Sequence, residues 1–158
     1  MTDPETAPPT EARRSGKPYP GRHVTVTFDG ARCLHAGECV RSLPAVFDVT
    51  ARPWIRPDAA PADAVAAIVR RCPSGALQCS RTGEPDEEGP EPTFIHRSPA
   101  GRLYVRGRLV ITGSNTRVVE TRAIMCGCGA TQNAPYCDGS GPCAHEPIQS
   151  PSSHGDAE

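Results

Sequence analysis

The sequence predicts an α+β protein made of two small units, and three observations lead to this expectation. Apolar residues alternate with polar ones, as in a half-buried strand, near residue 24 and again beyond residue 100, whereas a helical period occurs over residues 61–72. Most of the eight cysteines fall into two groups with different spacings. The chain has 158 residues, 18 prolines and 15 glycines, so each core is small and needs covalent or metal staples.

Composition divides the chain further. Residues 1–20 contain five prolines and no apolar period, and residues 81–92 contain five acidic residues, three prolines and two glycines. We therefore expect a disordered arm over 1–20, a first folded unit over 21–80, an acidic Pro/Gly linker over 81–92, a second folded unit over 93–145 and a disordered tail over 146–158.

The first unit begins with a strand and contains the best helix. Val24, Val26 and Phe28 alternate with polar neighbours over residues 22–29, and Asp29-Gly30 is a turn signal. In the segment PADAVAAIVRRC, the apolar positions follow the i, i+3, i+4, i+7 pattern and end at Cys72. This pattern predicts a helix over 61–72 whose last inward-facing residue is a cysteine, and GALQCS is expected to add a closing strand.

The second unit is predicted to be rich in β-structure. Leu103, Val105, Leu109 and Ile111 follow a period of two, and TGSN separates this run from a second one, TRVVETRAIM. The pattern predicts a hairpin that leads directly into the second cysteine group. Three arginines alternate with the apolar residues and are expected to form a solvated outer face: Arg102, Arg106 and Arg108.

The first cysteine group consists of Cys33, Cys39 and Cys72, the last of which directly precedes Pro73. Clustered thiols in a reducing compartment are more often metal ligands or redox groups than disulfides, and soft sulfur suits iron. The residues CLHAGEC and RCPSGAL resemble the divergent monocluster ferredoxin family and, more loosely, the small three-iron ferredoxins. The resemblance implies a ferredoxin-like α+β domain that holds a 3Fe-4S or 4Fe-4S cluster.

The nuclearity of this first cluster stays open at the level of sequence. A four-iron ferredoxin would place a cysteine at the position of Ala36, which cannot ligate. Three thiolates match a 3Fe-4S cluster, with one thiolate per iron. A 4Fe-4S cluster would need a further ligand, and His35, Glu38 and Cys79 are within reach along the sequence.

The second cysteine group is CGCGATQNAPYCDGSG, which contains Cys126, Cys128 and Cys137. It closely resembles the CDGSH iron–sulfur family, whose members bind a 2Fe-2S cluster through three cysteines and the final histidine of that motif. A small zinc knuckle using the same thiols is the alternative interpretation. We expect Asp138 to brace the turn after the third cysteine.

The departure from that motif is Gly141, which stands in the place of the histidine. Two residues downstream are candidate replacements, namely Cys143, which is nearer and favours iron as a thiolate, and His145. Gly141-Pro142 can bend the chain and bring either one back. A third alternative is an open or unassembled site.

These expectations define a function class. We expect a soluble one-electron carrier that serves a redox partner protein, a reductase or an oxygenase-type enzyme. The alternatives are an iron–sulfur storage, transfer or sensing module, or a zinc-stabilised interaction protein. Apart from its cysteines, the sequence offers no constellation of nucleophile and base, so we expect no enzyme activity.

Charge and hydropathy exclude other classes. The formal net charge is −1, which argues against a nucleic-acid partner, and no apolar run is long enough for a membrane span or a secretory signal. We therefore expect a cytoplasmic protein. A homodimer is compatible with the CDGSH resemblance, because relatives often pair through their β regions.

Overall fold

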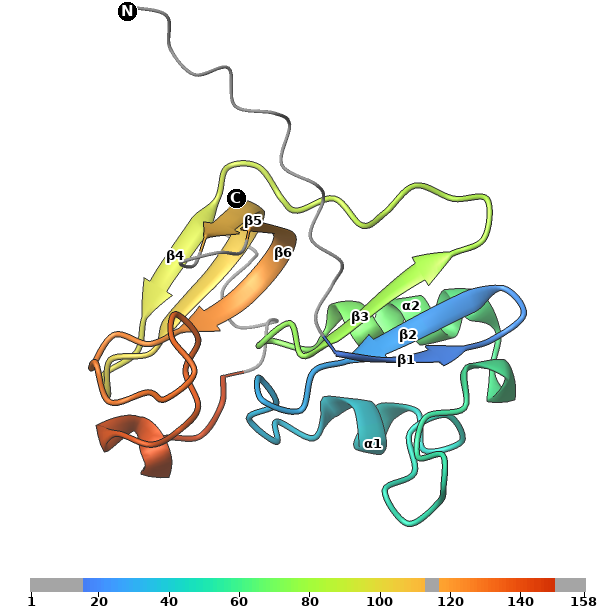
Figure 1. The fold of residues 1–158 in the computed structure, drawn as a ribbon, viewed down its shortest axis with the longest axis horizontal. Coiled ribbons are helices and arrows are strands. Elements are labelled where there is room, and N and C mark those ends of the chain that lie inside the picture. The colour runs from blue at the N-terminus through green and yellow to red at the C-terminus, as the bar shows by residue number, and fades with distance from the viewer. Residues whose placement is uncertain (1–15, 113–116, 150–158) are drawn as a thin grey trace, which may run out of the picture.

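The computed structural model describes residues 16–112 and 117–149 and contains two antiparallel three-stranded sheets, with strand orders β1-β2-β3 and β4-β5-β6 (Figure 1). The helices α1 and α2 lie with the first sheet, so the predicted α+β class is confirmed. Most of the predicted TGSN turn, residues 1–15 of the arm and residues 150–158 of the tail lie outside the described residues.

The elements follow one another without a crossover between the two sheets. The first unit contains β1 (Lys17–Pro20), β2 (Val24–Phe28), α1 (Glu38–Ser42), the 3₁₀ turn η1 (Pro57–Ala59), α2 (Ala62–Arg70) and β3 (Leu77–Arg81). The second contains β4 (Phe94–Arg97), β5 (Leu103–Thr112), β6 (Arg117–Met125) and the 3₁₀ turn η2 (Pro142–His145).

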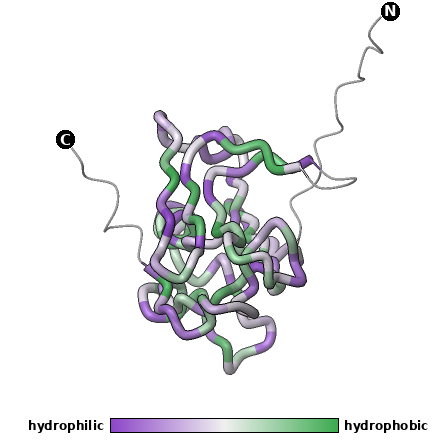
Figure 2. The backbone as a smooth tube through the Cα atoms, turned by 90° about the vertical axis from the view of Figure 1, so that its left-hand side faces the viewer, coloured by the Kyte–Doolittle hydropathy of each residue, from purple (hydrophilic) through white to green (hydrophobic). Residues whose placement is uncertain are grey.

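The core of the first unit lies between α2 and the sheet. Val24 and Val26 of β2 pack with Val65 and Val69 of α2, and all four are buried. The predicted strand and helix are thus confirmed, although α2 ends at Arg70 and Cys72 lies two residues beyond the helix rather than in it. Along the chain the residues change repeatedly between hydrophobic and hydrophilic (Figure 2). None of the helices in the described ranges is long and apolar enough to span a membrane.

The expectation of disorder over residues 1–20 is wrong for residues 17–20. These residues form β1, which pairs antiparallel with β2, and Tyr19 turns its ring into the core beside Trp54. The prolines at positions 18 and 20 suggested disorder, but β1 is an edge strand, where a residue without an N–H donor is tolerated.

The predicted hairpin is present as β5 and β6, but its outer face differs from the expectation. The pairing register shifts between Arg106 and Leu109, around Gly107 at φ 152°. Beyond this irregularity Arg108 is exposed as predicted, whereas Arg102 is only 3% exposed. The prediction of a solvated arginine face is therefore wrong for Arg102, because the chain after η2 folds back over it.

That covering segment belongs to the predicted disordered tail, which is wrong for residues 146–149. The Glu146 carboxylate accepts hydrogen bonds from the Ser98 hydroxyl (2.5 Å) and the Ala100 N–H (3.1 Å). The N–H of Gln149 donates to the Tyr104 hydroxyl at 3.1 Å, and Ile148 packs beside the buried Cys143.

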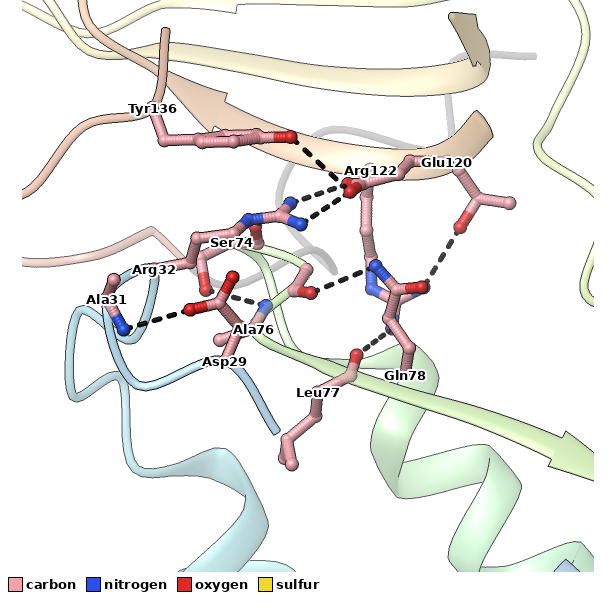
Figure 3. A network of polar contacts seen from close by, with 12 residues as sticks. Asp29, Ala31, Arg32, Ser74, Ala76, Leu77, Gln78, Glu120, Arg122 and Tyr136 are labelled. Carbon is pink, nitrogen blue, oxygen red and sulfur yellow. Dashed lines mark hydrogen bonds and ion pairs between the residues drawn. The ribbon is translucent and has the colours of Figure 1, made fainter. Parts of the chain in front are cut away.

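The two units are joined by a buried network of arginines (Figure 3). Arg32 of the first unit makes a two-pronged ion pair with Glu120 of β6, at 2.5 and 2.6 Å, and both side chains are 2% exposed. The guanidinium of Arg32 also stacks on the Tyr136 ring, 4.1 Å from its centroid. In the other direction, Arg122 of β6 donates to three carbonyl oxygens of the first unit, those of Val69, Cys72 and Leu77.

The linker is also held against this junction. Glu87, from the acidic segment, pairs with Arg122 at 2.7 Å. The backbone of Gly89 lies so close to the Gly107 carbonyl that an added Cβ would approach its oxygen to 1.9 Å, which excludes any side chain at position 89. The segment between the sheets is therefore fixed at two points.

Removing one partner of the buried ion pair should strongly destabilise the protein. In Glu120→Ala the Arg32 guanidinium stays buried without its counter-charge, so we expect a loss of about 3–5 kcal/mol in the free energy of unfolding, measured by denaturant titration. The control Asp63→Asn, which removes an exposed ion pair with Arg81, should cost less than about 1 kcal/mol. The double variant Arg32→Met/Glu120→Leu should recover most of the loss, and an equal loss in Asp63→Asn would contradict the assignment.

Candidate metal centres

The first cysteine group surrounds a cavity of about 40 Å³, larger than the space that one water needs. Three segments supply its thiols. Cys33 follows the turn after β2, Cys39 lies in the first turn of α1, and Cys72 follows α2. Phe28, Trp54 and Leu77 complete an apolar wall. The structure therefore brings together the three cysteines of the predicted first site.

Burial and mutual proximity govern the chemistry of these thiols. Burial raises the pKa of Cys33 and of Cys39, and the nearby Cys72 sulfur raises both further by like-charge repulsion. The raised pKa values of Cys33 and Cys39 mean that a bound cation would have to displace their protons. Cys72 is further placed by a sulfur–oxygen contact of 3.6 Å with the Ser74 hydroxyl.

The further ligand candidates of this site have different surroundings. His35 lines the cavity but is exposed, in a left-handed backbone conformation at φ 58°. Glu38 also lines the cavity, and its carboxylate pairs with Arg71 at 3.1 Å. Cys79 is buried in the core on β3, opposite Val26, and is not among the residues that line the cavity.

The second cysteine group forms two pairs of sulfurs. Cys126 and Cys128 are 3.8 Å apart, and Cys137 and Cys143 are 3.6 Å apart. Backbone hydrogen bonds join the two segments that carry Cys126 and Cys137. They run from Cys126 N–H to Pro135 O and from Cys137 N–H to Ile124 O, both at 2.9 Å. Two thiolates on one tetrahedral metal with bonds of about 2.3 Å lie roughly 3.8 Å apart. Each pair thus has the spacing of two ligands on one metal atom.

The loop between the pairs is braced by side chains. The Asp138 carboxylate accepts hydrogen bonds from the N–H groups of Gln132 (2.9 Å) and Ser140 (3.0 Å), and these bonds lower the pKa of Asp138 to about 2. The Thr131 hydroxyl donates to the Tyr136 carbonyl at 2.7 Å. The predicted bracing role of Asp138 is confirmed.

The two sulfur pairs differ in electrostatic environment. Burial acts to raise the pKa of Cys126, but hydrogen bonds from the N–H groups of Thr131, Cys128 and Gly129 outweigh it, and the pKa is lowered. Burial raises the pKa of Cys143, as does the neighbouring Cys137 thiol. Cys128 is exposed and Cys126 half-buried, whereas Cys137 and Cys143 are each 3% exposed. The Cys126–Cys128 pair therefore lies at the surface, and the Cys137–Cys143 pair lies in the interior.

His145, the other predicted replacement ligand, is exposed at the end of η2. Within residues 16–112 and 117–149, no three His, Cys, Asp or Glu side chains gather closely enough to hold a single metal ion. The sulfurs instead form one group of three and two adjacent pairs, and soft thiolates in such sets fit the iron atoms of a cluster.

Sequence analysis missed two residues that belong to these sites. Arg102 lies beside the thiols of Cys137 and Cys143; burial lowers its pKa, but the two thiols outweigh this effect and raise it. Leu34 lines the first cavity and also packs against the buried cluster of Ile124, Cys137 and Cys143. Leu34 follows Cys33 in the sequence, but nothing in the pattern indicated its contact with residues a hundred positions away.

Comparison with known proteins agrees with these two sites. Residues 19–82 match the family model of the divergent 4Fe-4S mono-cluster, and residues 100–140 match that of the CDGSH-type iron-binding zinc finger. The uncharacterized protein YjdI from Escherichia coli K12, and its counterpart in strain O157:H7, are each 40% identical over 60 residues, which span 38% of this chain and 79% of theirs. No solved structure matches the chain significantly. The protein therefore belongs to the divergent 4Fe-4S mono-cluster family and carries a CDGSH-type iron-binding domain in its C-terminal half.

Proposed function

We propose that this protein is a one-electron carrier with two iron–sulfur clusters. Cys33, Cys39 and Cys72 hold a 3Fe-4S or 4Fe-4S cluster, and the C-terminal cysteines hold a 2Fe-2S cluster. Clusters bound at these sites would supply one-electron redox chemistry, while the chain fixes their positions, their charge environment and their exposure.

The observation that carries the proposal is the position of Leu34. Its side chain lines the cavity of the first thiol group and packs against the buried cluster of Ile124, Cys137 and Cys143 in the second unit. Asn133, in the loop of the second group, donates to the Ala31 carbonyl at 3.1 Å, two residues before Cys33. The rate of electron tunnelling falls steeply with distance, so two redox sites that share one intervening side chain are suited to exchanging electrons.

The surface around the second group supports exchange with a partner protein. Cys128 is exposed, and Cys126 lies at the end of an open groove whose walls include Leu103, Val105 and Met125. Ile95, on the same groove, is 69% exposed. Transient redox complexes use small interfaces of this kind, and we propose a reductase or an oxygenase-type enzyme as the partner.

The outer pair, with Cys128 exposed and Cys126 half-buried, also favours a second candidate function. A cluster held on one side by exposed thiolates is open to attack by the thiolates of an acceptor, as cluster transfer requires. Storage, transfer or sensing of a cluster is therefore the alternative to electron transport.

Anaerobically purified protein should be coloured and contain about five to six irons per chain with matching sulfide. We expect both clusters to be reduced by one electron and reoxidised repeatedly without loss of iron, as followed by EPR and visible absorption. Zinc without sulfide would overturn both candidate functions. Irreversible loss of the C-terminal cluster on reduction, with its recovery on an apo-ferredoxin acceptor, would replace electron transport with cluster transfer.

Cys72 and Cys79 of the first unit should behave differently when each is replaced by alanine. Cys72→Ala should remove the first cluster, about three or four irons per chain, because its thiol lines the cavity. Cys79→Ala, the matched control in the core, should keep all the iron and lose only stability. Iron and sulfide analysis checks both variants, and loss of the first cluster in Cys79→Ala would place Cys79 among the ligands.

A further inference from the structure

The position that corresponds to the motif histidine is close-packed in this fold. Gly141 packs against the outer thiol pair, and a Cβ added there would lie 2.6 Å from the Cys128 sulfur and 2.9 Å from the Ala130 Cβ. Both approaches are shorter than a non-bonded contact permits. The missing ligand must therefore come from another residue.

The 3₁₀ turn that starts after Gly141 supplies one. Pro142 begins η2, and the turn buries Cys143 with its sulfur 3.6 Å from that of Cys137. This spacing nearly equals the 3.8 Å between Cys126 and Cys128 at the other side of the site. Because Gly141 contacts Cys128 and the turn that follows it contacts Cys137, η2 connects the two pairs. Four thiols in two pairs match two tetrahedral irons.

A fourth thiolate in place of a neutral imidazole adds one negative charge in a buried position, which is costly unless a cation compensates. The guanidinium of Arg102 is such a cation. It is 3% exposed and lies within electrostatic reach of both Cys137 and Cys143.

The hydrogen bonds of Arg102 leave part of its charge available to the site. Its Nη1 donates to the Glu146 carbonyl oxygen at 2.6 Å and is 3.9 Å from the carboxylate of that residue. Its buried Nε has no hydrogen-bond partner within residues 16–112 and 117–149. A buried donor without an acceptor is uncommon in native proteins, and an anionic sulfur at this site would satisfy it.

We propose that Cys143 is the fourth iron ligand of the C-terminal site and that the buried guanidinium of Arg102 is the positioning residue that balances its charge. The inference rests on the proposed function only in requiring a two-iron cluster at this site, and it holds whether the cluster carries electrons or is transferred.

The ligand assignment is tested by iron analysis and pulsed EPR on the full chain. Cys143→Ala should lose about two irons per chain and keep the N-terminal cluster signal, whereas His145→Ala, the exposed neighbour, should keep all its iron. The reduced wild-type C-terminal cluster should show no strong hyperfine coupling to a directly bound ¹⁴N. Such a coupling, lost in His145→Ala, would overturn the assignment, as would full iron retention in Cys143→Ala. A wild-type protein with this signature that fails to cycle electrons would refute only the proposed function.

The role of Arg102 is tested by the reduction potential of the C-terminal cluster. Arg102→Gln should shift it to a more negative value, because an added electron loses its neighbouring cation, while Arg102→Lys should keep most of the wild-type value. Arg108→Gln, which changes an exposed arginine on β5, should leave it unchanged. If Arg102→Gln cannot hold the cluster, selective loss of about two irons with the N-terminal cluster intact supports the same role. Equal potentials in wild type and Arg102→Gln would overturn it, as would an equal shift in Arg102→Lys.

Discussion

The buried ion pair between Arg32 and Glu120 is the constraint on which the arrangement of this protein depends. Each unit alone has a small core, and neither sheet continues into the other. The pair joins the loop before Cys33 to β6, the strand that leads to Cys126. It therefore fixes the positions of the two thiol groups relative to each other. An ion pair this buried is not a strong source of stability compared with apolar packing, but it is selective, because any other docking of the units would bury each charge alone.

Two further buried arginines, Arg122 and Arg102, lie beside the two cysteine groups. Arg122 donates to the carbonyls of Val69 and Cys72 at the end of α2, and Arg102 lies beside the Cys137 thiol. Thiolate groups and the clusters they bind are anionic, so burying them requires cations that do not lose their charge. Guanidinium groups meet this need because they stay protonated at any physiological pH. The same residues therefore fix the fold and prepare its interior for anionic groups.

The sequence predicted the features that have a local period or spacing. The strand around Val26, the helix around Val65, the hairpin and the cysteine groups were all visible, because apolar alternation and cysteine spacing are local properties. Strand β1 was missed, since prolines were taken as a sign of disorder and its stability comes from pairing with β2. The burial of Arg102 was missed for a related reason, because the residues that cover it lie more than forty positions later. Tertiary contacts decided these cases, and the sequence pattern does not contain them.

The two sulfur pairs of the C-terminal site give it two different sides. Cys128 is exposed and Cys126 is half-buried, with backbone N–H groups that lower the pKa of Cys126, whereas Cys137 and Cys143 are buried and have Arg102 beside them. The buried pair also belongs, with Ile124, to the cluster that packs against Leu34, which lines the cavity of the first group. For the proposed electron carrier, an inner side toward the first thiol group and an outer side toward solvent is the arrangement that a relay needs. With the fourth ligand on η2, as proposed, the inner side would be built entirely from buried sulfur.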